Sequence, residues 1–333
     1  MGRTLEPLVV ITGPTGIGKT ETAIHLARRI PLEVVSADSR QVYRRMEIGT
    51  GKPNPAQRAQ VPHHLLDLVD PDERYHAARF RREALTAIRE IRERGRLPVV
   101  VGGTGLYIRA LLRGLSPAPP GHPEFRGELS RWARGRSPNA LHQVLLKVDP
   151  EAARRIHPKD MMRIIRAIEV RRYREAPQVL GGSHSGHDGE GGAGDWAMNR
   201  PPFRLLMVGL TRPRAALATT LNFRVEAMVA QGLQDEVRGL LQAGYDESLS
   251  AMKGIGYRHF CWMLRGRISE AEAVRLMKRD TIRYAKRQWT WFKREPDLQW
   301  MDLKAPCDLE RAAQAIAKLI ERHGLLRGGR IPA

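Results

Sequence analysis

The segment that most constrains this 333-residue chain runs from Val9 to Ile30 and reads "VVITGPTGIGKTETAIHLARRI". It contains the pattern G-x-x-x-x-G-K-[ST], which forms a phosphate-binding loop when a strand precedes it and a helix follows it. The apolar run that ends at Gly13 predicts a buried parallel strand, and residues 20–29 have the periodicity of a helix. The sequence therefore predicts a P-loop.

Each residue type in this loop has a physical reason to lie near a phosphate. Glycines let backbone N–H groups turn toward an anion, and the helix N-terminus adds a partial positive charge. A lysine supplies a mobile charge for the terminal phosphates, and a threonine hydroxyl is placed to bind Mg²⁺. The predicted diphosphate- or nucleotide-binding residues are Gly13, Pro14, Thr15, Gly16, Ile17, Gly18, Lys19 and Thr20, with Thr20 as the ligand of a Mg²⁺ cofactor.

Strands and helices alternate after the loop. Residues 33–37 and the segment "RLPVVVGGTG" resemble buried strands, and residues 75–94 between them have the pattern of an amphipathic helix. This alternation predicts an α/β fold with a parallel sheet and right-handed crossovers. The apolar face of the predicted helix contains Phe80, Ala84, Ala87, Ile88 and Ile91.

The pattern changes after residue 115. Residues 123–175 are helical in pattern and rich in arginine, and the glycine-rich stretch 181–194, with His184 and His187, reads as a flexible, solvated loop. We expect residues 116–202 to form an inserted all-helical domain, and residues 1–115 and 203–333 to form the catalytic core. In the core we expect a strand over 203–210 and helices over 221–243, 269–294 and 308–323, with Ser269 and Glu272 as a capping box.

The charge of the chain points to a polyanionic partner. Lys and Arg number 56 against 36 acids, which gives a net charge of +20. Nucleic acid is the first candidate partner, and a general arginine bias of the source proteome is the alternative explanation. The two cysteines form no motif, which argues against a disulfide framework or zinc site and favours the reducing cytoplasm. We expect no signal peptide and no membrane-spanning segment.

The predicted core lacks the second acid that an NTPase uses to hold its metal. The strand in "PVVVGGTG" is followed by glycines and Thr104, and the acid at a core strand end is Asp38. This placement suggests that the loop binds a diphosphate leaving group while Asp38 handles a proton on the acceptor. The alternative is that Asp38 only caps a turn.

Several separate motifs occur in an order that resembles the tRNA dimethylallyltransferase (tRNA isopentenyltransferase) family over residues 7 to 325. The resemblance implies a P-loop nucleotide-kinase-like parallel sheet with helices on both faces and an inserted helical domain. The motifs are "GPTGIGKT", "DSRQVYRRMEIGTGKP", "VPHHLLD", "VVGGTGLY", "IHPKD" with "RIIRAIEV", "GLQDEV", "GIGYR" and "KRQWTWF".

The resemblance also implies the reaction. Enzymes of this family move the dimethylallyl group from dimethylallyl diphosphate to N6 of the adenosine on the 3′ side of a tRNA anticodon, and Mg²⁺ assists the departure of diphosphate. By resemblance, Asp38 is the base, Thr104 positions the reacting groups and Arg224 reaches the diphosphate. The implied partners are the tRNA anticodon stem-loop and the donor, and a monomer is expected.

The RNA contacts are predicted partly from the residues and partly from the resemblance. Arg279, Arg283 and Arg287 recur every four residues beside Lys286, which predicts a basic helix face for RNA. The nearby Tyr284, Trp289, Trp291 and Phe292 fit either base stacking or core packing. By resemblance, tRNA is also contacted by Asp38, Ser39, Arg40, Gln41, Thr104, Arg126, Met162, Arg163, Ile164, Ile165, Arg166, Lys253 and Arg258, with Met162 and Lys253 departing from polar residues of the family.

Three other functions are compatible with parts of this pattern. A P-loop phosphotransferase would consume the γ-phosphate of ATP, and a prenyltransferase for free adenine nucleotides would not need the basic helix. A non-catalytic RNA-binding protein would have no use for the intact set of Lys19, Thr20, Asp38 and Thr104.

Overall fold

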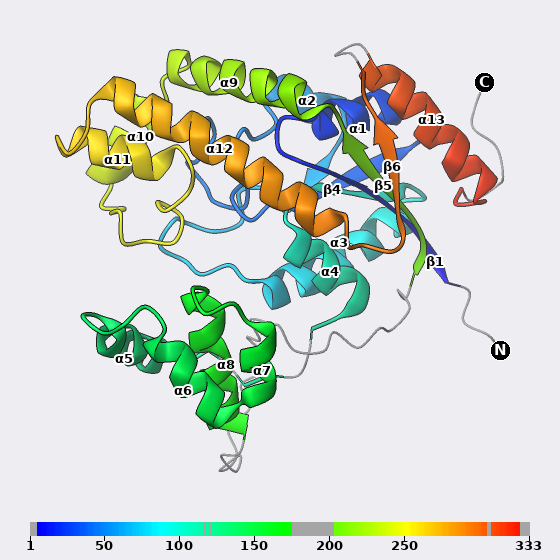
Figure 1. The fold of residues 1–333 in the computed structure, drawn as a ribbon. Coiled ribbons are helices and arrows are strands. Elements are labelled where there is room, and N and C mark those ends of the chain that lie inside the picture. Colours follow the sequence, from blue (N-terminus) through cyan, green and yellow to red (C-terminus); the bar gives the residue numbers. More distant parts are fainter. Residues whose placement is uncertain (1–4, 116–117, 120, 175–202, 305–307, 327–333) are drawn as a thin grey trace. The chain divides into compact units, whose positions relative to one another are not determined.

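The computed structural model describes residues 5–115, 118–119, 121–174, 203–304 and 308–326 (Figure 1). The glycine-rich stretch 181–194, with His184 and His187, lies outside these residues. The chain divides into two compact units, one formed by residues 1–75, 83–108 and 201–333 and the other by residues 76–82 and 109–200. The domain boundaries expected from the sequence stay a prediction.

Six strands form one sheet, and every pair of neighbouring strands is parallel. The P-loop strand β1 lies inside the sheet, where Val9 is opposite Val99 on one side and Leu206 on the other. The carboxyl ends of its neighbours therefore meet at the edge where ligands bind in such sheets. The strands are β1 (Glu6–Thr12), β2 (Leu32–Ser36), β3 (His63–His64), β4 (Leu97–Gly102), β5 (Phe203–Thr211) and β6 (Leu298–Asp302), in the order β3-β2-β4-β1-β5-β6.

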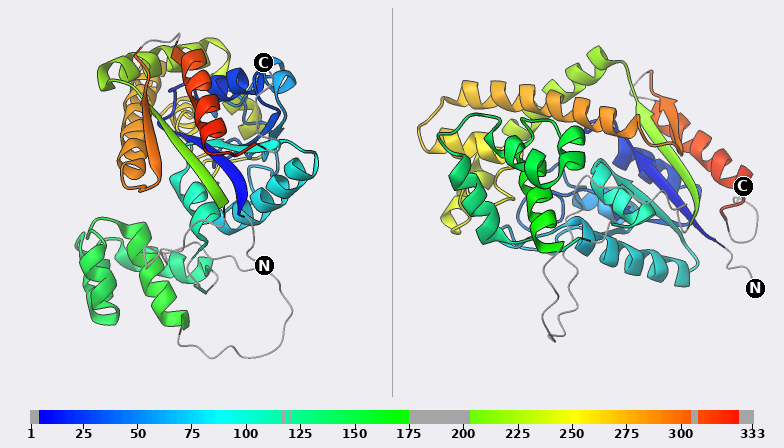
Figure 2. Two further views of the ribbon diagram at one scale, coloured as in Figure 1. Left: turned by 90° about the vertical axis from the view of Figure 1, so that its right-hand side faces the viewer. Right: turned by 60° about the horizontal axis from the view of Figure 1, so that its bottom comes forward.

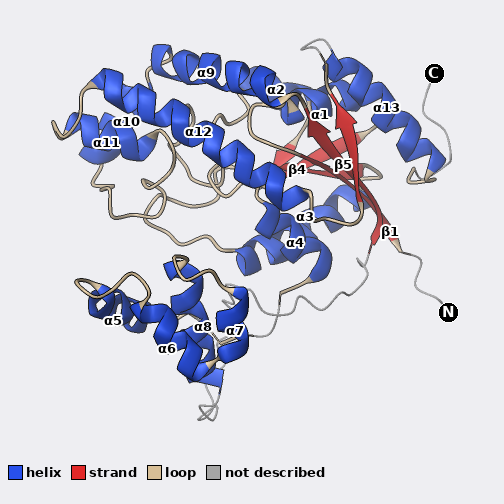
Figure 3. Ribbon diagram, viewed as in Figure 1, coloured by secondary structure: helices blue, strands red, loops and turns tan. Residues whose placement is uncertain are grey.

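Helices cover both faces of the sheet (Figure 3). α1 (Lys19–Ala27) and α13 (Asp308–Arg322) pack together on one face, where they share a core with Val9 and Ile11 (Figure 2). Leu8 and Val10 point to the other face and are fully buried. The face predicted for α3 (Ala77–Glu93) is also buried along its length. The predicted α/β fold, a parallel sheet with helices on both faces, is confirmed.

Four further helices of the first unit form a second core. α9 (Arg214–Ala230) packs against α12 (Glu270–Phe292), and α10 (Leu233–Gln242) packs against α11 (Tyr257–Leu264) (Figure 1). Val225, Leu233, Phe260 and Met277 are among the residues buried there. This layer places the basic residues of α12 on the outside of the unit.

Two expectations for this part of the chain were wrong. The single helix predicted over 221–243 is two helices, because Gly232 adopts a left-handed backbone at φ 95° and ends the first one. The segment after α12, where no strand was expected, contains strand β6. This edge strand has five residues, and none of them is buried. Its sequence lacks the alternation of apolar and polar side chains that predicts a half-buried strand.

The second unit contains a core of its own, formed by residues such as Leu141, Leu145, Ile164 and Ile168. None of the helices in the described part of the chain is both long and apolar enough to cross a membrane. The helices of this unit are α5 (Pro123–Ala133), α6 (Ala140–Val148), α7 (Pro150–Arg155) and α8 (Met161–Arg174), and α4 (Gly105–Arg113) begins in the first unit and ends in the second.

Candidate active site

The P-loop turns tightly between β1 and α1 and has little room for side chains. Gly13 has φ 136°, and a Cβ atom there would lie 2.4 Å from the carbonyl oxygen of Leu210 in the neighbouring strand β5. Neither the conformation nor the space admits another residue. The central sheet therefore dictates the first glycine of the motif.

The buried side-chain amide of Gln288 in α12 holds the P-loop in place. The Oε1 atom of Gln288 accepts a hydrogen bond of 2.8 Å from the backbone N–H of Thr15. Its Nε2 atom donates one of 2.9 Å to the carbonyl oxygen of Gly103, which follows β4. A single side chain thus ties the phosphate loop to the turn that contains Thr104.

Lys19 lies over the loop, with its Nζ atom 2.8 Å from the carbonyl oxygen of Pro14 and 3.1 Å from that of Gly13. Burial lowers the pKa of Lys19 to about 8, the charge of Asp38 opposes this shift, and the charge of Arg224 adds to it. The three predicted site residues Lys19, Asp38 and Arg224 therefore lie close enough to influence one another electrostatically.

Asp38 and Thr104 lie in adjacent turns that hydrogen-bond to each other. Asp38 Oδ1 accepts the backbone N–H of Arg40 at 2.8 Å, whereas Oδ2 has no hydrogen bond to any residue that the structure describes. Thr104 Oγ1 accepts the N–H of Ser39 at 3.0 Å, and its own N–H donates to Ala37. One Asp38 oxygen thus orients the carboxylate and the other remains available as an acceptor.

Tyr284 of α12 completes this side of the site. Burial together with the charge of Asp38 raises the pKa of Tyr284 to about 12, and the nearby Thr104 side chain opposes this shift. The phenol therefore stays neutral near pH 7. The guanidinium of Arg287 lies 5.7 Å from the centre of its ring.

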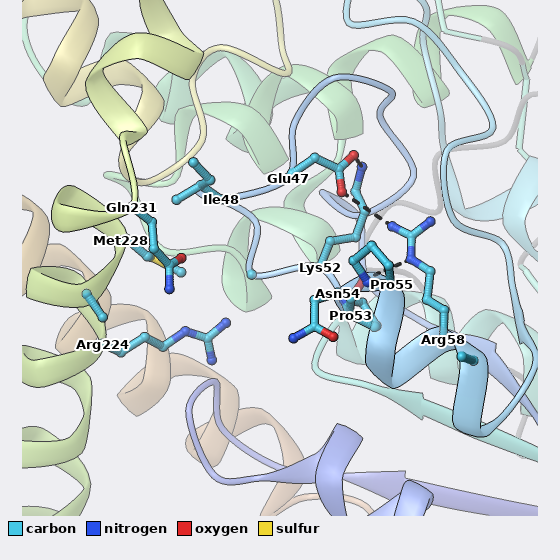
Figure 4. Close-up of a pocket in the computed structure, with 13 residues that line it drawn as sticks. Glu47, Ile48, Lys52, Pro53, Asn54, Pro55, Arg58, Arg224, Met228 and Gln231 are labelled. Atoms are coloured by element: carbon cyan, nitrogen blue, oxygen red, sulfur yellow. Dashed lines mark hydrogen bonds and ion pairs between the residues drawn. The ribbon is translucent and has the colours of Figure 1, made fainter.

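Arg224 projects from α9 into a cavity of about 950 Å³ (Figure 4). Burial lowers its pKa, and the charges of Glu21 and Asp38 oppose that shift. The cavity gathers charged and apolar side chains, with Arg58, Lys52 and Glu47 on the side opposite α9 in this view. Its lining consists of Glu47, Ile48, Gly51, Lys52, Pro53, Asn54, Pro55, Arg58, Ala59, Arg224, Ala227, Met228 and Gln231.

Two family profiles match the chain. The IPP transferase profile matches residues 41–295, and an isopentenyl transferase profile matches residues 7–67. The chain belongs to the IPP transferase family. The resemblance inferred from the ordered motifs is thereby confirmed, over most of the chain.

Relatives in this family match nearly end to end. The tRNA dimethylallyltransferase of Pelotomaculum thermopropionicum is 44% identical over 95% of this chain and 97% of its own length. The tRNA dimethylallyltransferase 2 of Geotalea uraniireducens is 48% identical over 89% of this chain and 92% of its own.

Solved structures of the family share the fold. The full-length tRNA isopentenylpyrophosphate transferase from Bacillus halodurans has a TM-score of 0.68 at 37% identity, with 96% of this chain and 98% of that chain covered. A eukaryotic dimethylallyltransferase acting on tRNA has a TM-score of 0.74 at 26% identity, with 97% and 80% covered.

The residues predicted to bind RNA in the first unit of this IPP transferase family member fall into two groups. Arg279, Arg283, Lys286, Arg287 and Lys253 are exposed. Others are held by the protein itself, through the contacts of Arg258 with Asp280, of Arg40 with the Ser250 carbonyl oxygen, and of Gln41 with Ser36 and Gly51.

Asp280 organises part of the basic face of α12. Burial alone would raise the pKa of its carboxyl group, but hydrogen bonds from Arg279, Arg258 and His259 outweigh burial and hold that pKa well below its usual range. The Asp280 carboxylate also lies 3.8 Å from Arg283. It therefore stays ionised and holds several cations on one side of the helix.

In the second unit, Arg126 and Arg166 both pair with the buried carboxylate of Glu169. Ile164 and Ile165 are buried, whereas Met162 is 75% exposed and Arg163 also faces solvent. The structure gives Arg126, Arg166 and the two isoleucines a packing role. Contact of any of these residues with RNA stays a prediction.

Sequence reasoning assigned no role in the site to Gln288 and left Tyr284 between stacking and core packing. Both lie on the inner face of α12, four residues apart, and Trp291 follows three residues later against Gly105. The spacing of one helix face was visible in the sequence. That this face would meet the ends of β2 and β4 depends on the tertiary fold.

Proposed function

We propose that this chain transfers a dimethylallyl group from dimethylallyl diphosphate to N6 of the adenosine on the 3′ side of the anticodon in tRNA, with release of diphosphate. The observation that carries the proposal is the convergence of Lys19, Asp38, Thr104 and Arg224 at one sheet edge in a chain of the IPP transferase family. Related proteins named tRNA dimethylallyltransferase support the substrate assignment.

The P-loop suits a diphosphate leaving group. The attacked carbon is allylic, so positive charge can spread over the group while negative charge grows on the departing oxygen. Loop N–H groups, Lys19 and Arg224 are fixed donors aimed at that charge. Because carbon moves and phosphorus does not, the missing metal-holding acid after β4 is not required.

Mg²⁺ is part of the proposal. No cluster of three His, Cys, Asp or Glu side chains that could hold a metal occurs within the described ranges. Thr20, in the first turn of α1, would hold the ion together with oxygens of the diphosphate, which is the usual way that Mg²⁺ binds in P-loop proteins. The bound ion would neutralise charge on the leaving group.

Asp38 suits the acceptor amine. The lone pair of adenine N6 is delocalised into the ring, so the amine gains nucleophilicity when a base accepts its proton. Asp38 Oδ2 is the available acceptor, and Thr104 and Tyr284 would position the base and donor beside it.

The exposed basic face of α12 and the net charge of +20 suit the tRNA backbone. Replacing both Arg283 and Arg287 with glutamine should weaken tRNA binding and reduce the salt slope of log K by about two, because each arginine accounts for about one phosphate contact. Filter binding across a salt series measures this slope. The control is Arg311→Gln on α13, and an unchanged slope in the double variant would place RNA on another surface.

The lowered pKa of Lys19 predicts a pH dependence for donor use. The protonated amine binds diphosphate, so kcat/KM for the donor should fall as pH rises through about 8. Loss of one proton limits the fall to about tenfold per pH unit. Initial rates at low donor concentration measure the profile. Lys19→Arg keeps its charge and should lack this midpoint, and a wild-type profile that stays flat to about pH 10 would contradict the assignment.

The direct test is to incubate the protein with dimethylallyl diphosphate, Mg²⁺ and unmodified tRNA, to digest the tRNA, and to identify its nucleosides by mass spectrometry. The proposal predicts dimethylallyl-adenosine in tRNA. Phosphorylated product from ATP would instead indicate a phosphotransferase, and prenylated free AMP with unmodified tRNA would indicate a nucleotide prenyltransferase. The monomeric state and the cytoplasmic location also remain proposals.

A further inference from the structure

The motifs "GLQDEV" and "GIGYR" contain two residues, Glu236 and Tyr257, that lie outside the site described above. The Glu236 carboxylate accepts three consecutive backbone N–H groups. Its Oε2 atom is 2.8 Å from the nitrogens of Glu47 and Ile48, and its Oε1 atom is 3.2 Å from that of Gly49. A run of inward-facing N–H groups is a nest for an anion, and here a side chain of the same chain occupies it.

Tyr257 supports the same carboxylate. Its hydroxyl donates to Glu236 Oε1 at 2.6 Å. Burial and the neighbouring Glu236 raise the pKa of Tyr257 well above its usual value, so it remains a donor. Its ring also packs on the loop, because a Cβ atom at Gly49 would lie 2.5 Å from the ring. Together the two residues hold residues 47–49 by backbone hydrogen bonds and by shape.

The loop held in this way ends against Arg224. Gly51 adopts φ 57°, and a Cβ atom there would lie 1.8 Å from Arg224 Nη2, so the bare backbone of Gly51 lies directly against the guanidinium. The far end of the loop is fixed by Lys52, whose buried Nζ atom donates to the Tyr43 carbonyl oxygen and pairs with Glu47 (Figure 4).

A second link joins the loop to the strand that precedes Asp38. The Gly51 carbonyl oxygen accepts from Gln41 Nε2 at 3.2 Å, and Gln41 Oε1 accepts from Ser36 Oγ at 3.2 Å. Residues 47–51 therefore connect the end of β2 with Arg224. Any shift of this loop changes the surface against which the guanidinium rests.

We propose that Glu236, assisted by Tyr257, is a positioning residue for the transfer reaction. It holds residues 47–51 so that Gly51 supports the Arg224 guanidinium in the orientation that meets the leaving diphosphate. This inference rests on the proposed role of Arg224, and Glu236 acts through the loop because its carboxylate oxygens are occupied by residues 47–49 and Tyr257.

The test replaces Glu236 with glutamine, which keeps the side-chain size but removes the charge and turns an NH₂ group toward the N–H groups of the loop. We expect kcat/KM for the donor to fall on the order of 10- to 100-fold, because small misplacements of a positioning group have effects of that size. Inhibition by added diphosphate should weaken in parallel, whereas KM for tRNA should stay within about twofold of the wild type.

Two variants separate positioning from general folding. Tyr257→Phe removes one hydrogen bond and keeps the ring, so it should give a smaller loss of the same kind. Glu226→Gln removes an exposed carboxylate that pairs with Lys278. This variant should leave kcat/KM for the donor and KM for tRNA unchanged. The proposal would be overturned if Glu236→Gln and Tyr257→Phe impaired kcat/KM for the donor and KM for tRNA by equal factors.

A double-mutant cycle with Arg224→Ala gives the decisive readout. If Glu236 acts through Arg224, adding Glu236→Gln to Arg224→Ala should change donor kcat/KM by less than about threefold. Losses that multiply would overturn the proposal. If the wild type prenylates no tRNA, the proposed function fails, but diphosphate affinity of the wild type and Glu236→Gln still tests the positioning role.

Discussion

Replacing Asp38 with alanine should lower kcat on the order of 10²- to 10⁴-fold, the usual range for loss of a general base. Binding of tRNA should change little, because Asp38 acts on one amine of one base. Single-turnover rates at saturating tRNA and donor, together with tRNA affinity by filter binding, measure the two effects separately.

Asp38→Asn distinguishes the base from a turn cap. Asparagine keeps an oxygen that can accept the N–H of Arg40, as Asp38 Oδ1 does at 2.8 Å, but it cannot take up a proton. We expect this variant to lose activity as severely as the alanine variant. Retained activity in Asp38→Asn would show that the carboxylate serves only the turn.

Replacing Lys19 with alanine should lower kcat/KM for the donor on the order of 10²- to 10³-fold, which is typical for removal of a donor to developing negative charge. The loss should also appear as weaker inhibition by diphosphate, while KM for tRNA stays close to that of the wild type. Steady-state kinetics with each substrate varied in turn make this comparison.

The matched control for Lys19 is Lys318→Ala on the exposed side of α13, which removes the same charge from the same unit away from the P-loop. This variant should behave as the wild type does. An active Lys19→Ala enzyme with normal donor KM would show that the P-loop does not bind the donor.

The pattern of apolar and polar residues within short stretches of the sequence was sufficient to predict the central sheet. The P-loop motif, the apolar runs of β2 and β4 and the amphipathic face of α3 are encoded within short windows, and the structure contains each of them. The break at Gly232 and the strand β6 were missed for opposite reasons. Gly232 has a helical pattern on both sides, whereas β6 has no clear pattern and is defined by pairing with β5.

Parallel topology explains why several site residues were predictable. The ends of β1, β2 and β4 lie side by side, so Lys19, Asp38 and Thr104, each of which follows one of these strands, meet at one edge of the sheet. Gln288 reaches the P-loop from α12, and Glu236 reaches residues 47–49 from α10. No local rule places those helices there. Burial of Ile164 and Arg166 likewise depends on how α8 packs within the second unit.

We propose that the P-loop holds a departing diphosphate while carbon moves to an RNA amine. This is tested by comparing the amount of diphosphate released from dimethylallyl diphosphate with the amount of adenosine alkylated in tRNA, with ATP present in the same reaction. We predict equal amounts of the two products and intact ATP. Hydrolysis of ATP or phosphoryl transfer from it, with the allylic donor unchanged and the tRNA unmodified, would contradict the claim.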